Sequence, residues 1–353
     1  MRSSSGVTPI TLFTKPYDCG GSCIFCPSVP SIPKSYLNRV NLSSISLCYS
    51  PQSQMDYWLS HIRIRGGIGN KLEVIILGGS FLGLPMRYIR WFIRQIYKTI
   101  DGPLGVRANT REYIKRHHDG CETRVVGITV EARPDQVTTS LVRQLFSLGV
   151  TKIELGVPTL NEEVLAINKR GHSTREIRDS TRIIKDNGLK IGYHILFGLP
   201  GATVETDIES AKEILSNTNY LPDHLKLYFC EMFKREYMSY DIIQLFDSLR
   251  WRPYNMSQRE YLLKNVIPLI PSYIRVSRIG RKFAKSDLEI EKLETPPVVQ
   301  HKDFGCKCIR CREPRELLNS ACTKSQTSLL EISTNDIFIE EHVSDMCLGV
   351  LRL

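Results

Sequence analysis

The chain has 353 residues, a formal net charge of +10 and a hydrophobic content of 42%. This length predicts one large domain and a smaller one, and the composition excludes a disordered or fibrous protein. Because no stretch has the apolar length of a signal-peptide core or a membrane span, we expect a cytoplasmic protein without a membrane partner. In a reducing compartment its eleven cysteines are expected to bind metal rather than to form disulfides.

Apolar strand-like runs alternate with helical patterns along most of the chain. The expected strands are residues 10–13, 74–77, 125–130, 152–157, 191–197 and 225–229, and the helices between them are residues 54–63, 88–99, 140–148, 175–187 and 204–215. Two further helices, 241–249 and 258–267, precede a seventh strand candidate at 274–279; two strands, 329–340 and 347–353, are expected last. The alternation predicts an α/β fold with a parallel sheet or barrel, with fewer strands than the eight of a complete barrel.

Three cysteines follow the first expected strand. Cys19, Cys23 and Cys26 have C-x3-C-x2-C spacing, and Gly20 and Gly21 allow a tight loop there. Three thiolates on a four-iron cluster leave one iron without a protein ligand. The alternatives are a zinc knuckle or buried thiols, but zinc prefers four ligands and no second cysteine pair lies nearby. The spacing resembles that of the radical S-adenosylmethionine (SAM) enzymes, which implies a 4Fe-4S cluster, SAM at the open iron and a partial (β/α)6 barrel.

Polar residues stand at the ends of several expected strands. Active sites of such sheets lie at the carboxyl ends of the strands, so these residues are expected to converge on one site. The candidates to contact SAM are Gly78, Gly79, Ser80, Glu131 and Arg133. Glu131 and Arg133 are alternatively a structural ion pair. Glu154 and His194 lie within strands and are either cavity residues or satisfied core groups.

A second triad, Cys306, Cys308 and Cys311, has C-x-C-x2-C spacing and predicts zinc, with a second cluster as the alternative. Basic residues gather at 107–116 and again at 275–285, and this pattern favours a nucleic-acid partner over a merely solvated surface. The candidate RNA contacts are Lys226, Arg275, Arg278, Arg281 and Lys282; further basic residues are Arg107, Arg111, Lys115 and Arg116.

With these features in order, the chain resembles the Elongator catalytic subunit family of radical-SAM tRNA carboxymethyluridine synthases. The resemblance rests on LGGSF (77–81), GITVEARPD (127–135), ELGV (154–157), NKRGH (168–172), GLPG (198–201), LKLY (225–228), the second cysteine triad and the final LGVLRL. It implies that the chain forms 5-carboxymethyluridine at the wobble uridine of tRNA from acetyl-CoA. It also implies tRNA and a separate acetyltransferase subunit or Elongator-like proteins as partners.

The chain departs from the family pattern in several places. The family's longer Cys-Pro-His loop is absent, Pro158 replaces a glutamine, and neither the amino-terminal tRNA-binding segment nor the acetyl-CoA loop is found. We expect residues 1–270 to form the radical-SAM core, 271–325 an accessory metal-binding segment, and 326–353 the start of a truncated acetyltransferase-like domain. Acetyl-CoA is then a co-substrate only if the missing part is supplied. The alternatives are a tRNA-binding remnant without catalysis and a radical-SAM enzyme with a non-RNA substrate.

Overall fold

The computed structural model describes residues 6–37, 42–64, 71–101, 123–281, 283, 285–289, 304–312, 341–343 and 350–352. Within these residues, seven parallel strands form one sheet in which each strand pairs with the next along the chain. The strands are β1 (Thr8–Phe13), β2 (Lys71–Leu77), β3 (Arg124–Ala132), β4 (Lys152–Gly156), β5 (Lys190–Phe197), β6 (His224–Phe229) and β7 (Arg275–Ile279). Because all pairs are parallel, the carboxyl ends of the strands lie at one edge of the sheet.

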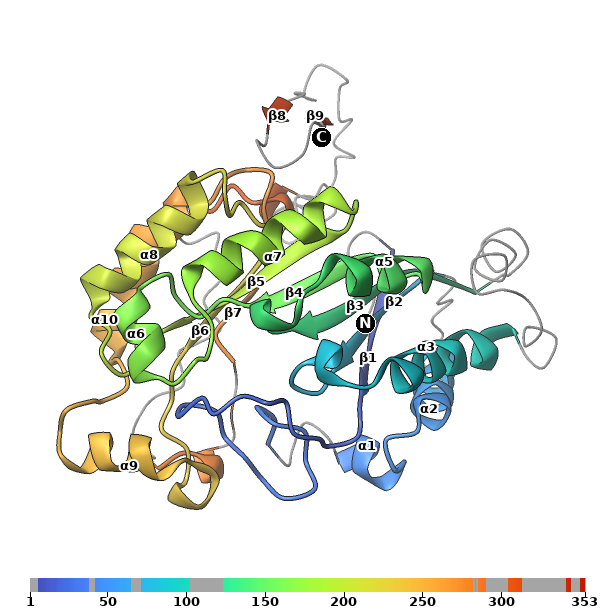
Figure 1. Cartoon of the computed structure of the whole chain (residues 1–353), viewed down its shortest axis with the longest axis horizontal. Helices are drawn as coiled ribbons and strands as arrows, with labels where there is room; N and C mark the ends of the chain where they lie inside the picture. Colours follow the sequence, from blue (N-terminus) through green and yellow to red (C-terminus); the bar gives the residue numbers. More distant parts are fainter. Residues whose placement is uncertain are drawn as a thin grey trace, which may run out of the picture.

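Helices make the crossovers that parallel strands require. Figure 1 shows α10, α8, α7, α5, α3 and α2 following one another around the outside of the curved sheet. The α-helices are α1 (Leu42–Ser46), α2 (Pro51–Ile64), α3 (Met86–Asp101), α5 (Thr139–Ser147), α6 (Glu162–Ile167), α7 (Thr174–Asp186), α8 (Val204–Ser216), α9 (Tyr240–Asp247) and α10 (Met256–Val266). Short 3₁₀ helices are η2 (Phe81–Gly83), η4 (Pro134–Gln136), η5 (Arg235–Tyr237), η6 (Ile267–Leu269), η7 (Lys285–Asp287) and η9 (Ile309–Arg312).

The predicted partial α/β barrel is confirmed, with seven strands in its sheet rather than six. The seventh strand candidate is β7, which pairs with β6 and so extends the barrel sheet. The other predicted strands and helices up to residue 267 appear with bounds shifted by a few residues. The strand expected at 329–340 lies outside the described residues. Within 347–353 the structure describes β9 (Val350–Arg352), which pairs antiparallel with β8 (Glu341–Val343).

The helices pack against the sheet through their apolar faces. In α3, Ile89, Phe92, Ile93 and Ile96 are fully buried, and each such side chain contributes about 1.5–3 kcal/mol of transfer free energy. Ser173 and Glu176 form a capping box at the start of α7. No helix in the described ranges is long and apolar enough to cross a membrane.

Candidate active site

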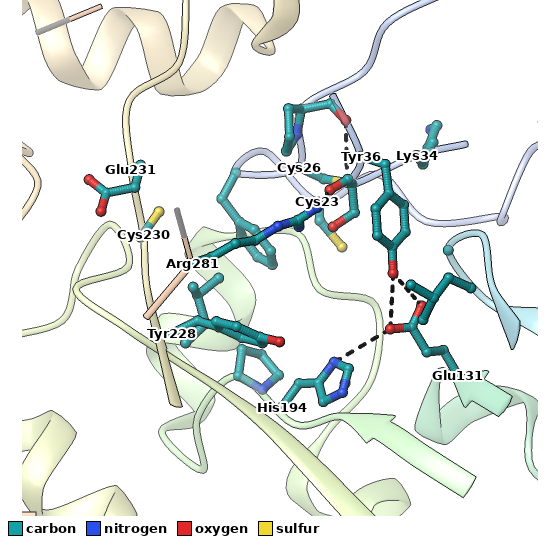
Figure 2. Close-up of a pocket in the computed structure, with 18 of the residues that line it drawn as sticks. Cys23, Cys26, Lys34, Tyr36, Glu131, His194, Tyr228, Cys230, Glu231 and Arg281 are labelled. Carbon is teal, nitrogen blue, oxygen red and sulfur yellow. Dashed lines mark hydrogen bonds and ion pairs between the residues drawn. The ribbon is translucent and has the colours of Figure 1, made fainter. Parts of the chain in front are cut away.

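A cavity of about 1220 Å³ opens at the carboxyl ends of the strands. Its lining includes Cys19, Cys23 and Cys26 after β1, Gly79 and Ser80 after β2, Glu131 and Arg133 at the end of β3, His194 in β5, Lys226 in β6 and Arg281 after β7. In Figure 2 the segment that carries Cys23 and Cys26 lies across this space from Glu131 and His194. The predicted convergence of the cysteine loop, the Gly-Gly-Ser turn and the end of β3 is therefore confirmed.

The cysteine loop turns tightly, as its glycines predicted. Gly20 has a φ of +71°, which favours glycine, and its N–H donates to Asp18 Oδ1 at 3.0 Å. All three cysteines of the loop are partly exposed. Burial among protein atoms raises the pKa of the Cys26 thiol to about 12, and the neighbouring Cys23 and Cys19 raise it further. Three neighbouring thiolates need positive charge to compensate them, and a metal cluster supplies it. The donor set therefore fits the predicted cluster.

The turn after β2 needs its glycines. Gly78 and Gly79 have φ values of +148° and +99°, and a Cβ on Gly78 would lie 2.0 Å from Thr14 Oγ1. Thr14 Oγ1 is buried and has no hydrogen-bond partner among the described residues. A side chain at position 78 would therefore clash with Thr14 and push the residue that follows β1 away from this turn.

Ser80 ties this turn to both neighbouring loops. Its N–H donates to Tyr17 Oη at 3.0 Å, and its hydroxyl accepts the N–H of Arg133 at 3.1 Å. The hydroxyl also bonds Gln136, whose Nε2 donates to the carbonyl of Cys19 at 3.1 Å. Ser80 is fully buried, so its role here is to fix the ends of β2 and β3 against the cysteine loop.

Arg133 is the centre of a second set of bonds. Its Nε donates to Asp135 Oδ1 at 3.0 Å and its Nη2 to the carbonyl of Arg170 at 2.9 Å. Its Nη1 lies 3.7 Å from Cys23 Sγ, and Nη1 of Arg170 lies 3.3 Å from the same sulfur. Burial on its own would raise the pKa of Asp135, but His172 and Arg133 hold it near 2. The carboxylate therefore stays ionised and fixes Arg133.

The floor of the cavity carries a chain of polar contacts across four strands. Tyr36 Oη donates to both oxygens of Glu131, at 3.0 and 2.8 Å, and Glu131 Oε1 lies 4.0 Å from His194 Nδ1. His194 Nε2 lies 3.0 Å from Glu154 Oε2, which also accepts from Lys226 Nζ. Burial alone would raise the pKa of Glu154, yet Lys226 and His194 hold it well below its usual range. Glu154 and His194 are thus both hydrogen-bonded cavity residues, Glu154 buried and His194 half-buried.

The ligand atoms of Glu131, Glu154 and His194 lie within 4.8 Å of one another, a spacing that suits a cation. The Lys226 ammonium already bonds Glu154, and Lys152 Nζ lies 3.8 Å from its other oxygen. A metal ion would add positive charge beside two ammonium groups. The arrangement therefore suits a charge-balanced proton network better than a metal centre.

The predicted RNA contacts fall into different environments. Arg278 in β7 and Arg281 just after it line the cavity, and the Arg281 guanidinium lies 4.9 Å from the Tyr36 ring centroid. Arg278 is exposed and makes no ion pair with any other described residue. Lys226 lies in the cavity floor, and Arg275 lies at the amino end of β7, outside the cavity lining. Lys282, Arg107, Arg111, Lys115 and Arg116 lie outside the described residues.

The second cysteine triad is buried against β7. The sulfurs of Cys306, Cys308 and Cys311 lie within 4.8 Å of one another, and the Ile309 N–H donates to the Ile274 carbonyl at 3.0 Å. A hydrogen bond with Cys308, followed by burial, raises the pKa of the Cys306 thiol. This close set of buried sulfurs fits three of the four positions of a tetrahedral zinc site. Among the described residues no fourth side chain joins the group.

Several residues of the site were missed by the sequence analysis. Arg170 was used only as part of the NKRGH motif, although its guanidinium reaches Cys23. Tyr36, Tyr17 and Gln136 carry no motif, and only the folded chain brings them to Glu131, Ser80 and Cys19. The arginine of the NKRGH motif could have been proposed as a contact of the cysteines. Tyr36, Tyr17 and Gln136 gave no such signal in the sequence.

A partial barrel of parallel strands, with three cysteines beside a cavity at the carboxyl end of β1, is the combination expected of a radical SAM protein. The model of the Radical SAM superfamily matches residues 16–214. A tRNA uridine(34) acetyltransferase of Dehalococcoides mccartyi is 30% identical over all of this chain and 78% of its own length. The human Elongator complex protein 3 is 28% identical over all of this chain and 68% of its length.

A solved structure is similar to this chain in the same way as these relatives. Archaeal Elp3 of Methanocaldococcus infernus with an amino-terminal deletion superposes with a TM-score of 0.70 and 25% identity, over 88% of this chain and 66% of that one. A Methanocaldococcus jannaschii tRNA uridine(34) acetyltransferase matches at 30% identity, but the chain spans only 59% of its length. The chain therefore belongs to the radical SAM superfamily, and within it to the family of the tRNA uridine(34) acetyltransferases and Elongator complex protein 3.

Proposed function

We propose that this protein modifies tRNA, forming 5-carboxymethyluridine at the wobble uridine from acetyl-CoA. The proposal rests on the relative from Dehalococcoides mccartyi, whose similarity extends over 100% of this chain. The cavity beside the cysteine loop supports it. Its volume of about 1220 Å³ exceeds the 300–1,000 Å³ of ordinary single-ligand pockets, which leaves room for SAM and a nucleoside together.

The superfamily implies a 4Fe-4S cluster and SAM. Cys19, Cys23 and Cys26 would hold the cluster, which together with SAM supplies a radical that abstracts hydrogen. Gly79 lines the cavity and would leave room for SAM because it has no side chain. A zinc ion held by the second triad would fix that segment on β7.

The residues of the floor would orient the nucleobase and hold protons. Lys226 is anchored by Glu154, and burial alone would lower its pKa, but the pair with Glu154 raises it, so the ammonium stays charged. A charged donor fixed in a cavity suits a carbonyl oxygen of uracil better than an exposed phosphate. A wobble base stands in a single-stranded loop, so it enters the cavity without the unpairing cost of a duplex.

Arg278 and Arg281 would contact the RNA backbone at the mouth of the cavity. Both line it, and Arg281 is held in place because its Nη1 donates to the Ser35 carbonyl at 3.1 Å. Fixed guanidinium groups next to a nucleoside site are suited to phosphate.

The proposal is tested with protein reconstituted anaerobically with iron and sulfide. SAM and dithionite are added with an anticodon stem-loop that has uridine at the wobble position, or with a matched stem-loop that has cytidine there. We expect 5′-deoxyadenosine in both cases and more of it with the uridine RNA. No SAM cleavage by protein with a fully formed cluster would instead indicate a tRNA-binding remnant, and cleavage without any RNA binding at low salt would indicate a non-RNA substrate.

A further inference from the structure

Two arginine side chains contact the same cysteine sulfur. Nη1 of Arg170 lies 3.3 Å from Cys23 Sγ, and Nη1 of Arg133 lies 3.7 Å from it. Arg133 directly follows β3, whereas Arg170 follows α6, so the two cations reach Cys23 from separate parts of the barrel. Cys26 differs, because its sulfur contacts the carbonyl of Pro27 at 3.8 Å. The three cysteines of the loop therefore stand in unequal electrostatic surroundings.

The positions of both guanidinium groups are built into the fold. A Cβ on Gly21 would lie 2.3 Å from Arg133 Nη1, and a Cβ on Gly156 would lie 2.5 Å from Arg170 Nη2. Both close approaches therefore require glycine. Asp135 holds Arg133 at 3.0 Å, and the Gly156 carbonyl holds Arg170 Nη2 at 2.8 Å. The contacts with Cys23 are thus fixed by several neighbours rather than by one free side chain.

Hydrogen bonds to the sulfurs and the local charge set the reduction potential of an iron–sulfur cluster. An added electron makes the cluster more negative, and a fixed cation stabilises this reduced form more than the oxidised one. We propose that Arg133 and Arg170 are positioning residues that raise the reduction potential of the cluster through Cys23. This inference requires the cluster that the superfamily implies, but it does not depend on the RNA substrate.

The test compares Arg170→Gln and Arg133→Gln with Lys169→Gln. Lys169 is next to Arg170 and its loss changes the charge equally, but its side chain is 52% exposed and pairs with Asp241 instead of a cysteine. The cluster of each reconstituted variant is titrated with dithionite, and the reduced form is followed by electron paramagnetic resonance. We expect the ratio of reduced to oxidised cluster at a fixed potential to fall about tenfold in each arginine variant, equivalent to about 59 mV for one electron. Lys169→Gln should titrate as the unaltered protein does.

The variants also separate this role from two others. If Arg170→Gln does not take up iron, Arg170→Lys is titrated instead; it keeps the charge but loses the guanidinium fork, and a smaller shift in the same direction is expected. Unchanged potentials in the arginine variants would overturn the proposal. Unchanged potentials together with weaker SAM binding by calorimetry would assign both arginines to SAM. An equal shift in Lys169→Gln would also overturn it, because the effect would then be one of net charge.

Discussion

The two cysteine triads contain the same ligands in opposite settings. Cys19, Cys23 and Cys26 are partly exposed, line the large cavity and stand beside two guanidinium groups. Cys306, Cys308 and Cys311 are buried, belong to the hydrophobic core and pack along β7. Three ligands that line a cavity would leave a coordination position open to a reactant, whereas a metal held by buried sulfurs would serve the fold. The comparison teaches that similar cysteine spacing occurs in two different environments, one open to a cavity and one within the core.

Cys23→Ala gives the largest expected effect. It would remove one of the three proposed cluster ligands, so cluster uptake and SAM cleavage should fall to background. Iron content, visible absorbance and 5′-deoxyadenosine formation measure this, with Cys48→Ala as the control because Cys48 is exposed and does not line the cavity. The melting temperature should change little, since the loop is partly exposed. A large loss of stability would contradict the contrast between the triads.

Cys308→Ser should have the converse effect. Its sulfur is fully buried, and a zinc ion held there, as proposed, would contribute folding free energy directly. On that proposal we expect zinc loss and several kcal/mol of destabilisation. Thermal unfolding with and without a chelator measures it, again beside Cys48→Ser. The folded fraction should still bind the iron–sulfur cluster at the first triad. Retention of full stability without zinc would remove the structural role assigned to the second triad.

The sequence predicted the barrel and the first triad because both depend on local patterns. Strand and helix periodicity repeats over long segments, and the cysteines of each triad lie within eight residues of one another. The contacts of Cys23 with Arg133 and Arg170 join residues that are 110 and 147 positions apart, and the bond from Tyr36 to Glu131 spans 95. No local pattern fixes such pairs, since they depend on where each loop leaves the sheet. The inclusion of β7 was missed for the same reason, because pairing with β6 is a tertiary contact.

Glu154→Gln tests whether the charges in the cavity floor also support the fold. It leaves Lys226 without its buried partner, and breaking such a pair costs about 3–5 kcal/mol. Because the folded-state pKa of Glu154 is lowered, its stabilisation is present above the unfolded pKa and is lost as the pH falls through the folded pKa. The free-energy difference between the two proteins in urea unfolding should therefore shrink below about pH 4.5.

Glu73→Gln is the matched control for that experiment. Glu73 pairs with Lys152 at 3.1 Å, but its side chain is 33% exposed, so its loss should cost no more than about 1 kcal/mol. Equal losses in the two variants would mean that burial does not distinguish the cavity floor from the rim of the barrel.

The smallest expected effect lies in β7, the strand that the second triad packs against and that ends at the cavity. Arg275 and Arg278 stand three positions apart in it, and only Arg278 is in the cavity lining. If RNA lies over the cavity, Arg278→Gln should weaken tRNA binding and reduce the slope of log affinity against log salt by about 0.7–0.9, the contribution of one phosphate contact.

Arg275→Gln changes the net charge equally and should leave the slope unchanged. Filter binding over a range of salt concentrations distinguishes the two. Equal changes would mean that the RNA responds to the overall charge of the protein, so that the carboxyl end of β7 would have no special part in binding.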